Sequence, residues 1–267
     1  MLTRVVLLMY VLSSVSGARP TDTSGGGGDA RSEEYEHLVP ESGILFEPGS
    51  SYHYQEALLA FLLAGTDINR QCQMVVEESV WGTEKESVVF IERDRRTGRS
   101  TVVRRFAKKS ISQAVSAAIF DKTRPPGADY WPYLKIKTSD IGENRALLSE
   151  ETAETMSQAC EMMLGMVRYP TRTRLLLHPT AVHFAHHDVN HGYRAGKTEF
   201  DRGRVGKFKR LLEQLGEVAM ASATARPAAE KRVKDAAAAL VAELSAAGIA
   251  IPNIKGEMRS APSPSQP

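Results

Sequence analysis

Apolar and polar residues along this chain repeat with two periods, and the period separates predicted helices from predicted strands. The clearest helical period begins at Ser149, a favourable N-cap that two acidic residues follow, and Pro170 ends it. The sequence predicts four further helices, over residues 55–64, 110–122, 205–219 and 227–247. The helix that begins at Ser149 has an apolar stripe of Met156, Ala159, Cys160, Met163, Leu164 and Val167.

Strand-like alternation marks other segments. The sequences ESVVFIERD and RSTVVRRF flank RRTG, which predicts a β-hairpin with Gly98 in its turn. The segment QCQMVVEES, which begins at Gln71, has the same strand character. In PYLKIKTSDI, Leu134 and Ile136 alternate with charged residues, which predicts a half-buried strand.

The order of these elements indicates the fold class. Helices and strands interleave, but short turns join the paired strands, and short turns are typical of antiparallel pairing. We therefore predict an α+β fold. It has an antiparallel sheet of about five or six strands built from hairpins, packed by helices, with a C-terminal helical pair.

The ends of the chain predict export and a single folded domain. Arg4, a short apolar run and small residues up to Ala18 are typical of a cleaved signal peptide over 1–18; an uncleaved anchor is the alternative. Residues 19–43, which include GGGG, predict a flexible tether, and 251–267 a disordered tail. The single domain then covers 44–250. No later segment is apolar enough to span a bilayer, so we expect a periplasmic or secreted protein.

Export changes how the two cysteines are interpreted. In an oxidising compartment Cys72 and Cys160 can form a disulfide. Such a bridge would close a loop of about 88 residues and stabilise the fold by about 4 kcal/mol. Two separate buried thiols are the alternative, because free cysteine is among the most buried residue types.

Five of the seven histidines lie between His178 and His191. On a helix, His183 and His187 would have a metal-ligand spacing, but Pro179 favours a turn between two strands, residues 175–177 and 182–184. On a strand the two histidines lie about 13 Å apart, too far to share one zinc ion. His183 would then lie on the more solvent-exposed face of the strand, and His186 would lie on the opposite face. The metal-ligand candidates that remain are His183, His187, Asp188 and His191.

Familiar catalytic motifs do not occur in the sequence. There is no HExxH, no G-x-S-x-G nucleophile elbow, no P-loop and no G-x-G-x-x-G after a strand. We therefore predict no catalytic residues and no cofactor from motifs alone.

The predicted hairpin concentrates positive charge in a chain of formal net charge +2. Eight Arg or Lys residues and one acid, Asp94, lie between Arg93 and Lys109. Arg95, Arg96 and Arg99 fall at the turn, where they must be exposed and would attract an anionic surface or an acidic protein partner. We do not expect nucleic acid as a partner, because it is less available to an exported protein. Aromatic residues are also sparse in the hairpin, which does not support stacking on single strands. A solvated edge that prevents aggregation is the alternative.

From Cys72 to Leu215 the pattern resembles a group of exported proteobacterial proteins to which no activity is assigned. The segments that carry the resemblance are VVFIERD, MVRYPTRTRLLL, AVHFA and GYRAGKT, the last followed by a leucine-rich helix. The resemblance implies export and an α+β fold, and implies no catalytic residues.

Two function classes remain open. The first is an exported, non-enzymatic binding or interaction module, which the lack of a catalytic constellation favours. The second is a metal-dependent hydrolase that uses the cluster from His183 to His191.

Overall fold

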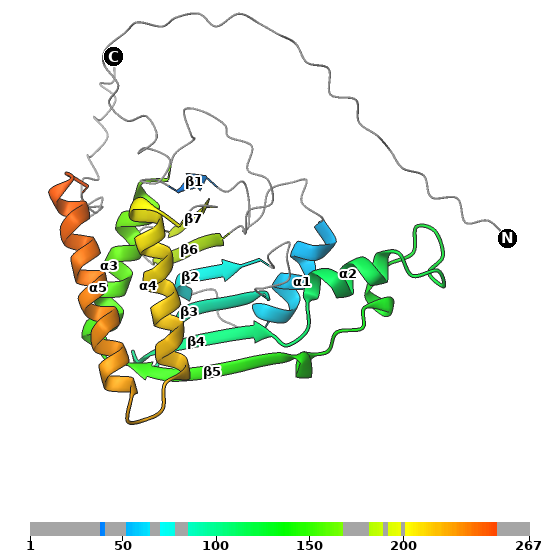
Figure 1. Cartoon of the computed structure of the whole chain (residues 1–267), viewed down its shortest axis with the longest axis horizontal. Helices are drawn as coiled ribbons and strands as arrows, with labels where there is room; N and C mark the ends of the chain where they lie inside the picture. The colour runs from blue at the N-terminus through cyan, green and yellow to red at the C-terminus, as the bar shows by residue number, and fades with distance from the viewer. Residues whose placement is uncertain are drawn as a thin grey trace, which may run out of the picture. The chain divides into compact units, whose positions relative to one another are not determined.

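The computed structural model describes residues 38–40, 52–64, 70–77, 85–167, 182–188, 192–198 and 201–249. It contains one antiparallel sheet with the order β1-β7-β6-β2-β3-β4-β5 (Figure 1). Six strands are seven or eight residues long: β2 (Arg70–Val76), β3 (Ser87–Arg93), β4 (Ser100–Ala107), β5 (Ile141–Leu148), β6 (Val182–Asp188) and β7 (Gly192–Thr198). A two-residue strand, β1 (Val39–Pro40), pairs with β7.

Five helices accompany the sheet in the described part of the chain: α1 (Tyr52–Leu62), α2 (Ile111–Ile119), α3 (Glu150–Gly165), α4 (Gly203–Met220) and α5 (Arg226–Ala246). The α+β class is confirmed, and α4 and α5 form the predicted C-terminal helical pair. None of the helices in these residues is long and apolar enough to cross a bilayer.

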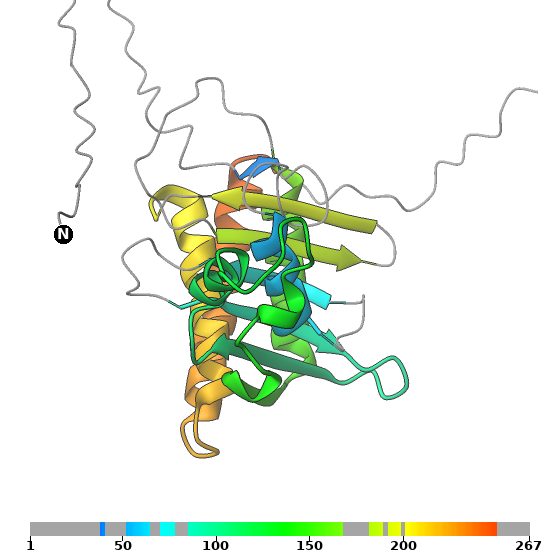
Figure 2. The same ribbon diagram turned by 90° about the vertical axis from the view of Figure 1, so that its right-hand side faces the viewer.

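Helices cover both faces of the sheet (Figure 1). The core on one face packs α3, α4 and α5 against alternate strand residues such as Met74, Val89 and Val102. The neighbouring strand residues, such as Val75 and Val88, point the other way and pack against α1 and α2. Figure 2 looks from the α1–α2 side and shows the strands between these helices and α4 with α5. A sheet buried on both faces explains the continuous apolar runs in its central strands, MVV of β2 and VVFI of β3.

Local signals define the ends of three helices, and the N-cap predicted at Ser149 is confirmed. The side chain of Ser110 accepts a hydrogen bond from the Gln113 backbone N–H and caps α2. Ser149 caps α3 in the same way through the N–H of Thr152. Gly248 follows α5 with φ of 77°, a conformation that favours glycine.

The strand predicted over PYLKIKTSDI is wrong. Two 3₁₀ turns, Trp131–Tyr133 and Thr138–Asp140, occupy this segment, and the strand that follows is β5. Pro132 suits the start of a 3₁₀ turn because it has no N–H to donate. Ile136 is buried beside two exposed lysines, so an irregular segment that packs on one side produced the strand-like alternation.

The predicted partner of residues 182–184 is also wrong. β6 pairs with β2 along one edge, where Val75 lies opposite His183, and with β7 along the other. Both edges are therefore occupied, and none is left for the segment 175–177, which lies outside the described residues. The strand interpretation of Val182 onward is itself confirmed.

Residues 38–40, which fall within the predicted tether over 19–43, pack against the folded domain. Leu38 is completely buried in the α3–α5 core, and Val39 lies opposite Lys197 of β7. The remaining residues of 1–37 and 41–51, and the predicted tail, lie outside the described part of the chain.

Candidate functional site

A disulfide joins the sheet to α3. Cys72 of β2 and Cys160 of α3 are bonded through their sulfur atoms, with a Cα–Cα distance of 5.6 Å, and both side chains are completely buried. The predicted disulfide is therefore confirmed, and the alternative of two free thiols is wrong. Cys160 belongs to the predicted apolar stripe of α3, which faces the sheet.

The backbone at Cys72 is unusual for a residue other than glycine. Its φ is 49°, in the left-handed region, and the β2–β3 register shifts between Gln71 and Met74. One extra residue of β2 is accommodated there, which makes the site a β-bulge. A left-handed conformation costs a side-chain-bearing residue roughly 1–2 kcal/mol. The cross-link to α3 explains why a cysteine occupies a position that favours glycine.

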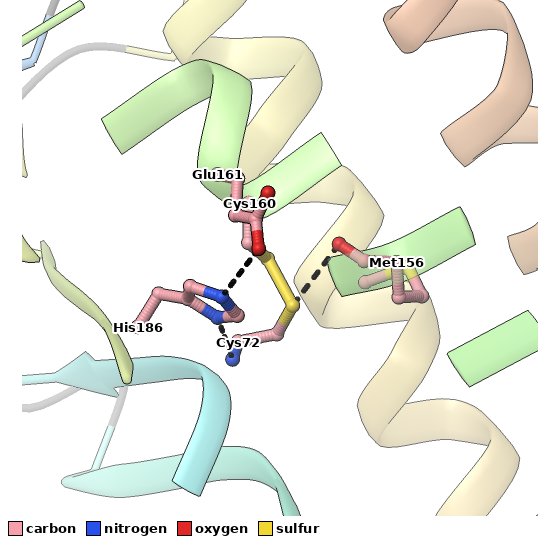
Figure 3. The surroundings of a disulfide bond; sticks show 5 residues. All are labelled: Cys72, Met156, Cys160, Glu161 and His186. Carbon is pink, nitrogen blue, oxygen red and sulfur yellow. Dashed lines mark hydrogen bonds and ion pairs between the residues drawn. A yellow bond between two sulfur atoms is a disulfide. The ribbon is translucent and has the colours of Figure 1, made fainter. Parts of the chain in front are cut away.

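A buried histidine and a glutamate complete the cluster around the disulfide (Figure 3). The Cys72 backbone N–H donates to Nδ1 of His186 at 3.2 Å, and Nε2 of the same ring lies 3.6 Å from Oε1 of Glu161. Since the N–H can only donate, Nδ1 must accept and the ring proton of neutral His186 sits on Nε2, facing the carboxylate. The Cys72 sulfur also lies 3.1 Å from the Met156 carbonyl oxygen.

A polar cleft of about 280 Å³ lies beside this cluster, between α3 and the turn end of the β3–β4 hairpin. Three carboxylates of α3 line the cleft, from Glu150, Glu154 and Glu161. Arg93 of β3 also lines it. The cationic turn therefore borders an acidic helix face, so the local positive field is smaller than the count of arginines in the sequence implies.

The clustered histidines separate onto opposite faces of the sheet. His186 contacts the bulge and α3, whereas His183 lies on the α1–α2 side, opposite Val75, with its Nε2 3.1 Å from Oε1 of Glu77. The separation of His183 from His186 is confirmed. The wetter face predicted for His183 is wrong, because this side chain is only 5% exposed.

The side chains of the remaining metal candidates, His187, Asp188 and His191, lie outside the described part of the structure. His187 and Asp188 lie at the end of β6, and His191 lies outside the described residues. Positions 183 and 187 of one strand are about 13 Å apart. Within the described ranges no group of three or more His, Cys, Asp or Glu side chains is arranged to hold a metal ion. The metal site therefore stays a prediction.

The turn of the basic hairpin is held by one carboxylate. Asp94 accepts hydrogen bonds from the backbone N–H groups of Arg96 (2.7 Å) and Thr97 (3.1 Å), and these bonds lower the pKa of Asp94. Gly98 has φ of 70°, as such a turn requires. Arg95, Arg96 and Arg99 are exposed, as predicted.

Other cations of the same run have structural partners. Arg105 donates to Glu143 at 2.6 Å and to the carbonyl oxygens of Leu62 and Ala64, at 3.1 and 2.7 Å, which fixes the end of α1 to the sheet. Arg104 lies over the Phe106 ring and contacts the Met220 sulfur. Much of the charge that stood out in the sequence is therefore part of the fold.

Comparison with known proteins identifies no relative. No protein-family model matches the chain, and neither a curated protein nor a solved structure gives a significant match. The function must therefore be argued from the site geometry alone.

Proposed function

We propose that this chain is an exported, non-enzymatic binding module whose hairpin turn attaches it to an anionic membrane surface. The main support is that Arg95, Arg96 and Arg99 are exposed together on one turn. The side chain of Asp94 holds the backbone of this turn in place. Within the described part of the chain, the guanidinium groups of Arg96 and Arg99 make no hydrogen bond or ion pair. These two groups are therefore available to an external anion.

Export is supported by two independent features. The first residues have the signal-peptide pattern, and a disulfide between residues 88 positions apart is typical of proteins that fold in an oxidising compartment. Such a compartment exposes the turn to lipid headgroups rather than to nucleic acid.

The expected attachment is weak and electrostatic. A Lys or Arg near an anionic membrane contributes about 1 kcal/mol, so three arginines give an interaction of about 3 kcal/mol. Glu150 and Glu154 on the neighbouring face of α3 reduce this value further. Binding should therefore be detectable at low ionic strength and lost near about 0.15 M salt, where the screening length is about 8 Å.

Co-sedimentation with vesicles tests the proposal. Vesicles rich in phosphatidylglycerol should retain the protein at low salt, and vesicles of phosphatidylcholine alone should not. Replacing all three residues, Arg95→Glu, Arg96→Glu and Arg99→Glu, should abolish retention. The matched control reverses three exposed cations elsewhere in the chain and so makes the same change in net charge: Lys122→Glu, Arg202→Glu and Arg232→Glu.

Three outcomes would contradict the proposal. They are the absence of retention at low salt, retention that is indifferent to salt, and equal loss in the control variant. Selective capture by an acidic protein without vesicle retention would assign the turn to a protein partner instead.

A further inference from the structure

A second cationic region lies at the opposite end of the β3–β4 hairpin. Lys85 precedes β3, Lys108 and Lys109 follow β4, and Lys135 comes from the segment between the two 3₁₀ turns. Together they surround a pocket of about 480 Å³, here called the lysine pocket, whose other polar lining residues are Ser110 and Gln113. No carboxylate is among the described residues that line it.

Hydrogen bonds and an ion pair fix the side chains of Lys85, Lys108 and Lys109 at the edge of this pocket. The Lys85 ammonium donates to the carbonyl oxygen of Lys108 at 2.7 Å, and the Lys108 ammonium donates to that of Ser139 at 3.0 Å. Lys109 pairs with Asp140 at 2.9 Å. Each of these contacts uses one of the three N–H donors of an ammonium group, so donors remain for a ligand.

The positive end of α2 adds little to the pocket. The backbone N–H of Ser112 donates to Glu86 at 2.7 Å, and that of Gln113 donates to the Ser110 side chain at 2.9 Å. These first-turn donors are already satisfied within the protein. The four lysines are therefore the feature that distinguishes the pocket. Asp140 attracts both Lys108 and Lys109, and Asp121 attracts Lys135, so two carboxylates offset part of the positive charge.

We propose that the lysine pocket binds a small ligand that carries two or more adjacent phosphate groups. Lysine is a point-like cation on a flexible stem and suits clustered phosphate oxygens. Arginine, which favours planar bidentate anions, is not among the lining residues that the structure describes. The four lysines exceed the two neighbouring carboxylates by two positive charges, which adjacent phosphate groups in a small volume would offset. No aromatic residue is among the described residues that line the pocket, so no ring in the ligand is called for.

The lysine pocket is large enough for a small ligand and lies apart from the turn arginines. Its volume lies within the usual range of about 300–1,000 Å³ for small-molecule sites. From Arg93 to Ser87, β3 spans roughly 20 Å at about 3.3 Å per residue, so the pocket is well separated from the turn arginines. This inference therefore does not rest on attachment of the turn to a membrane.

Calorimetric titration of the full chain with inorganic pyrophosphate tests the site. We expect one pyrophosphate per chain, and at least tenfold weaker binding in the variant Lys85→Gln with Lys135→Gln. Lys135→Gln alone should reduce the affinity for pyrophosphate by a smaller factor. This single variant tests the site even if the double variant does not fold. The Arg95, Arg96 and Arg99 charge-reversal variant should keep the wild-type affinity, which separates this site from the turn.

Comparison anions define the ligand class. Sulfate and citrate should bind at least tenfold more weakly than pyrophosphate. Vesicles of phosphatidic acid, tested with the Arg95, Arg96 and Arg99 charge-reversal variant at constant ionic strength, distinguish the source. Retention that pyrophosphate displaces assigns a lipid headgroup, and titration without retention assigns a soluble phosphate compound. Absence of pyrophosphate binding, equal binding of sulfate, or an unchanged affinity in both lysine variants would overturn the proposal.

Discussion

The backbone N–H of Cys72 donates to Nδ1 of His186 across 3.2 Å, although 114 positions separate the two residues in the sequence. The same Cys72 is bonded through its sulfur to Cys160. One residue of β2 therefore connects to β6 through its backbone and to α3 through its side chain. The bulge, the disulfide and the buried histidine stabilise one another, and the first three predictions concern this cluster.

The disulfide should stabilise the fold substantially. Closing a loop of about 88 residues limits the unfolded chain and contributes about 4 kcal/mol in the loop-entropy model. Cys72→Ala with Cys160→Ala should lower the unfolding free energy by a value of this size in urea titration. A thiol assay on denatured, unreduced protein should find no free thiol, and two free thiols would reject the bridge.

Because the backbone at Cys72 is left-handed, we expect glycine to stabilise the fold more than alanine at this position, the reverse of the usual order. With the partner changed to Cys160→Ala, Cys72→Gly should be more stable than Cys72→Ala by about 1 kcal/mol. The reason is that glycine adopts φ of 49° without the steric cost of a Cβ atom. Urea titrations of the two double variants measure the difference. Higher stability of the alanine variant would mean that the bulge relaxes once the cross-link is gone.

His186 should be required as a hydrogen-bond acceptor. His186→Phe leaves the buried N–H of Cys72 without its acceptor, which costs about 1–3 kcal/mol. His186→Gln, whose side-chain oxygen can accept, should lose less. Comparing the two variants by urea unfolding checks the role, and equal losses would indicate that ring packing, rather than the hydrogen bond, is what matters.

Sequence patterns predicted the elements whose signals are local. Ser149 caps α3 where the sequence placed it, and Gly98 lies in the turn of the predicted hairpin, because caps and turns depend on neighbouring residues. β5 was missed for the opposite reason. Glu143 and Arg145 interrupt its apolar pattern, and what makes this segment a strand is its pairing with β4.

The site around the disulfide was only half predictable. Two cysteines and a signal-peptide pattern were enough to suggest the bridge. The contact of His186 with Cys72 depends on the bulge in β2 and on the pairing of β2 with β6, which no local signal specifies. The lysine pocket was hidden for a related reason, because Lys85 and Lys135 join Lys108 only in the folded chain.

Two arginines of the basic hairpin should differ sharply in their effect on stability. Arg105 is largely buried and donates to Glu143 and to two carbonyl oxygens at the end of α1, so Arg105→Ala should destabilise the fold by about 1.5–3 kcal/mol. Arg96→Ala, at the exposed turn, should change stability by less than about 0.5 kcal/mol. Thermal unfolding compares the two, and similar shifts would contradict the division of the hairpin into structural and available cations.

The ionisation of Glu230 makes the stability of the contact between α5 and the start of α3 depend on pH. This α5 residue accepts a hydrogen bond from the Ser149 backbone N–H at 2.7 Å, at the start of α3. Burial raises the pKa of Glu230, but its hydrogen bonds with Ser149 and Thr152 outweigh burial and hold the pKa below the ordinary value of 4.5. A carboxyl whose pKa is lower in the folded state stabilises the fold above the unfolded-state pKa. That stability is lost as the pH falls through the folded-state pKa.

Unfolding free energies measured by urea titration between about pH 6 and pH 3 should show this loss, since each pKa unit corresponds to about 1.4 kcal/mol per group at most. Glu230→Gln should reduce the slope of stability against pH below pH 4.5, because the amide does not ionise. Glu217→Gln, at an exposed position of α4, controls for the removal of one negative charge. A Glu230→Gln variant that keeps the full wild-type slope would show that the Ser149 contact does not favour the ionised carboxylate.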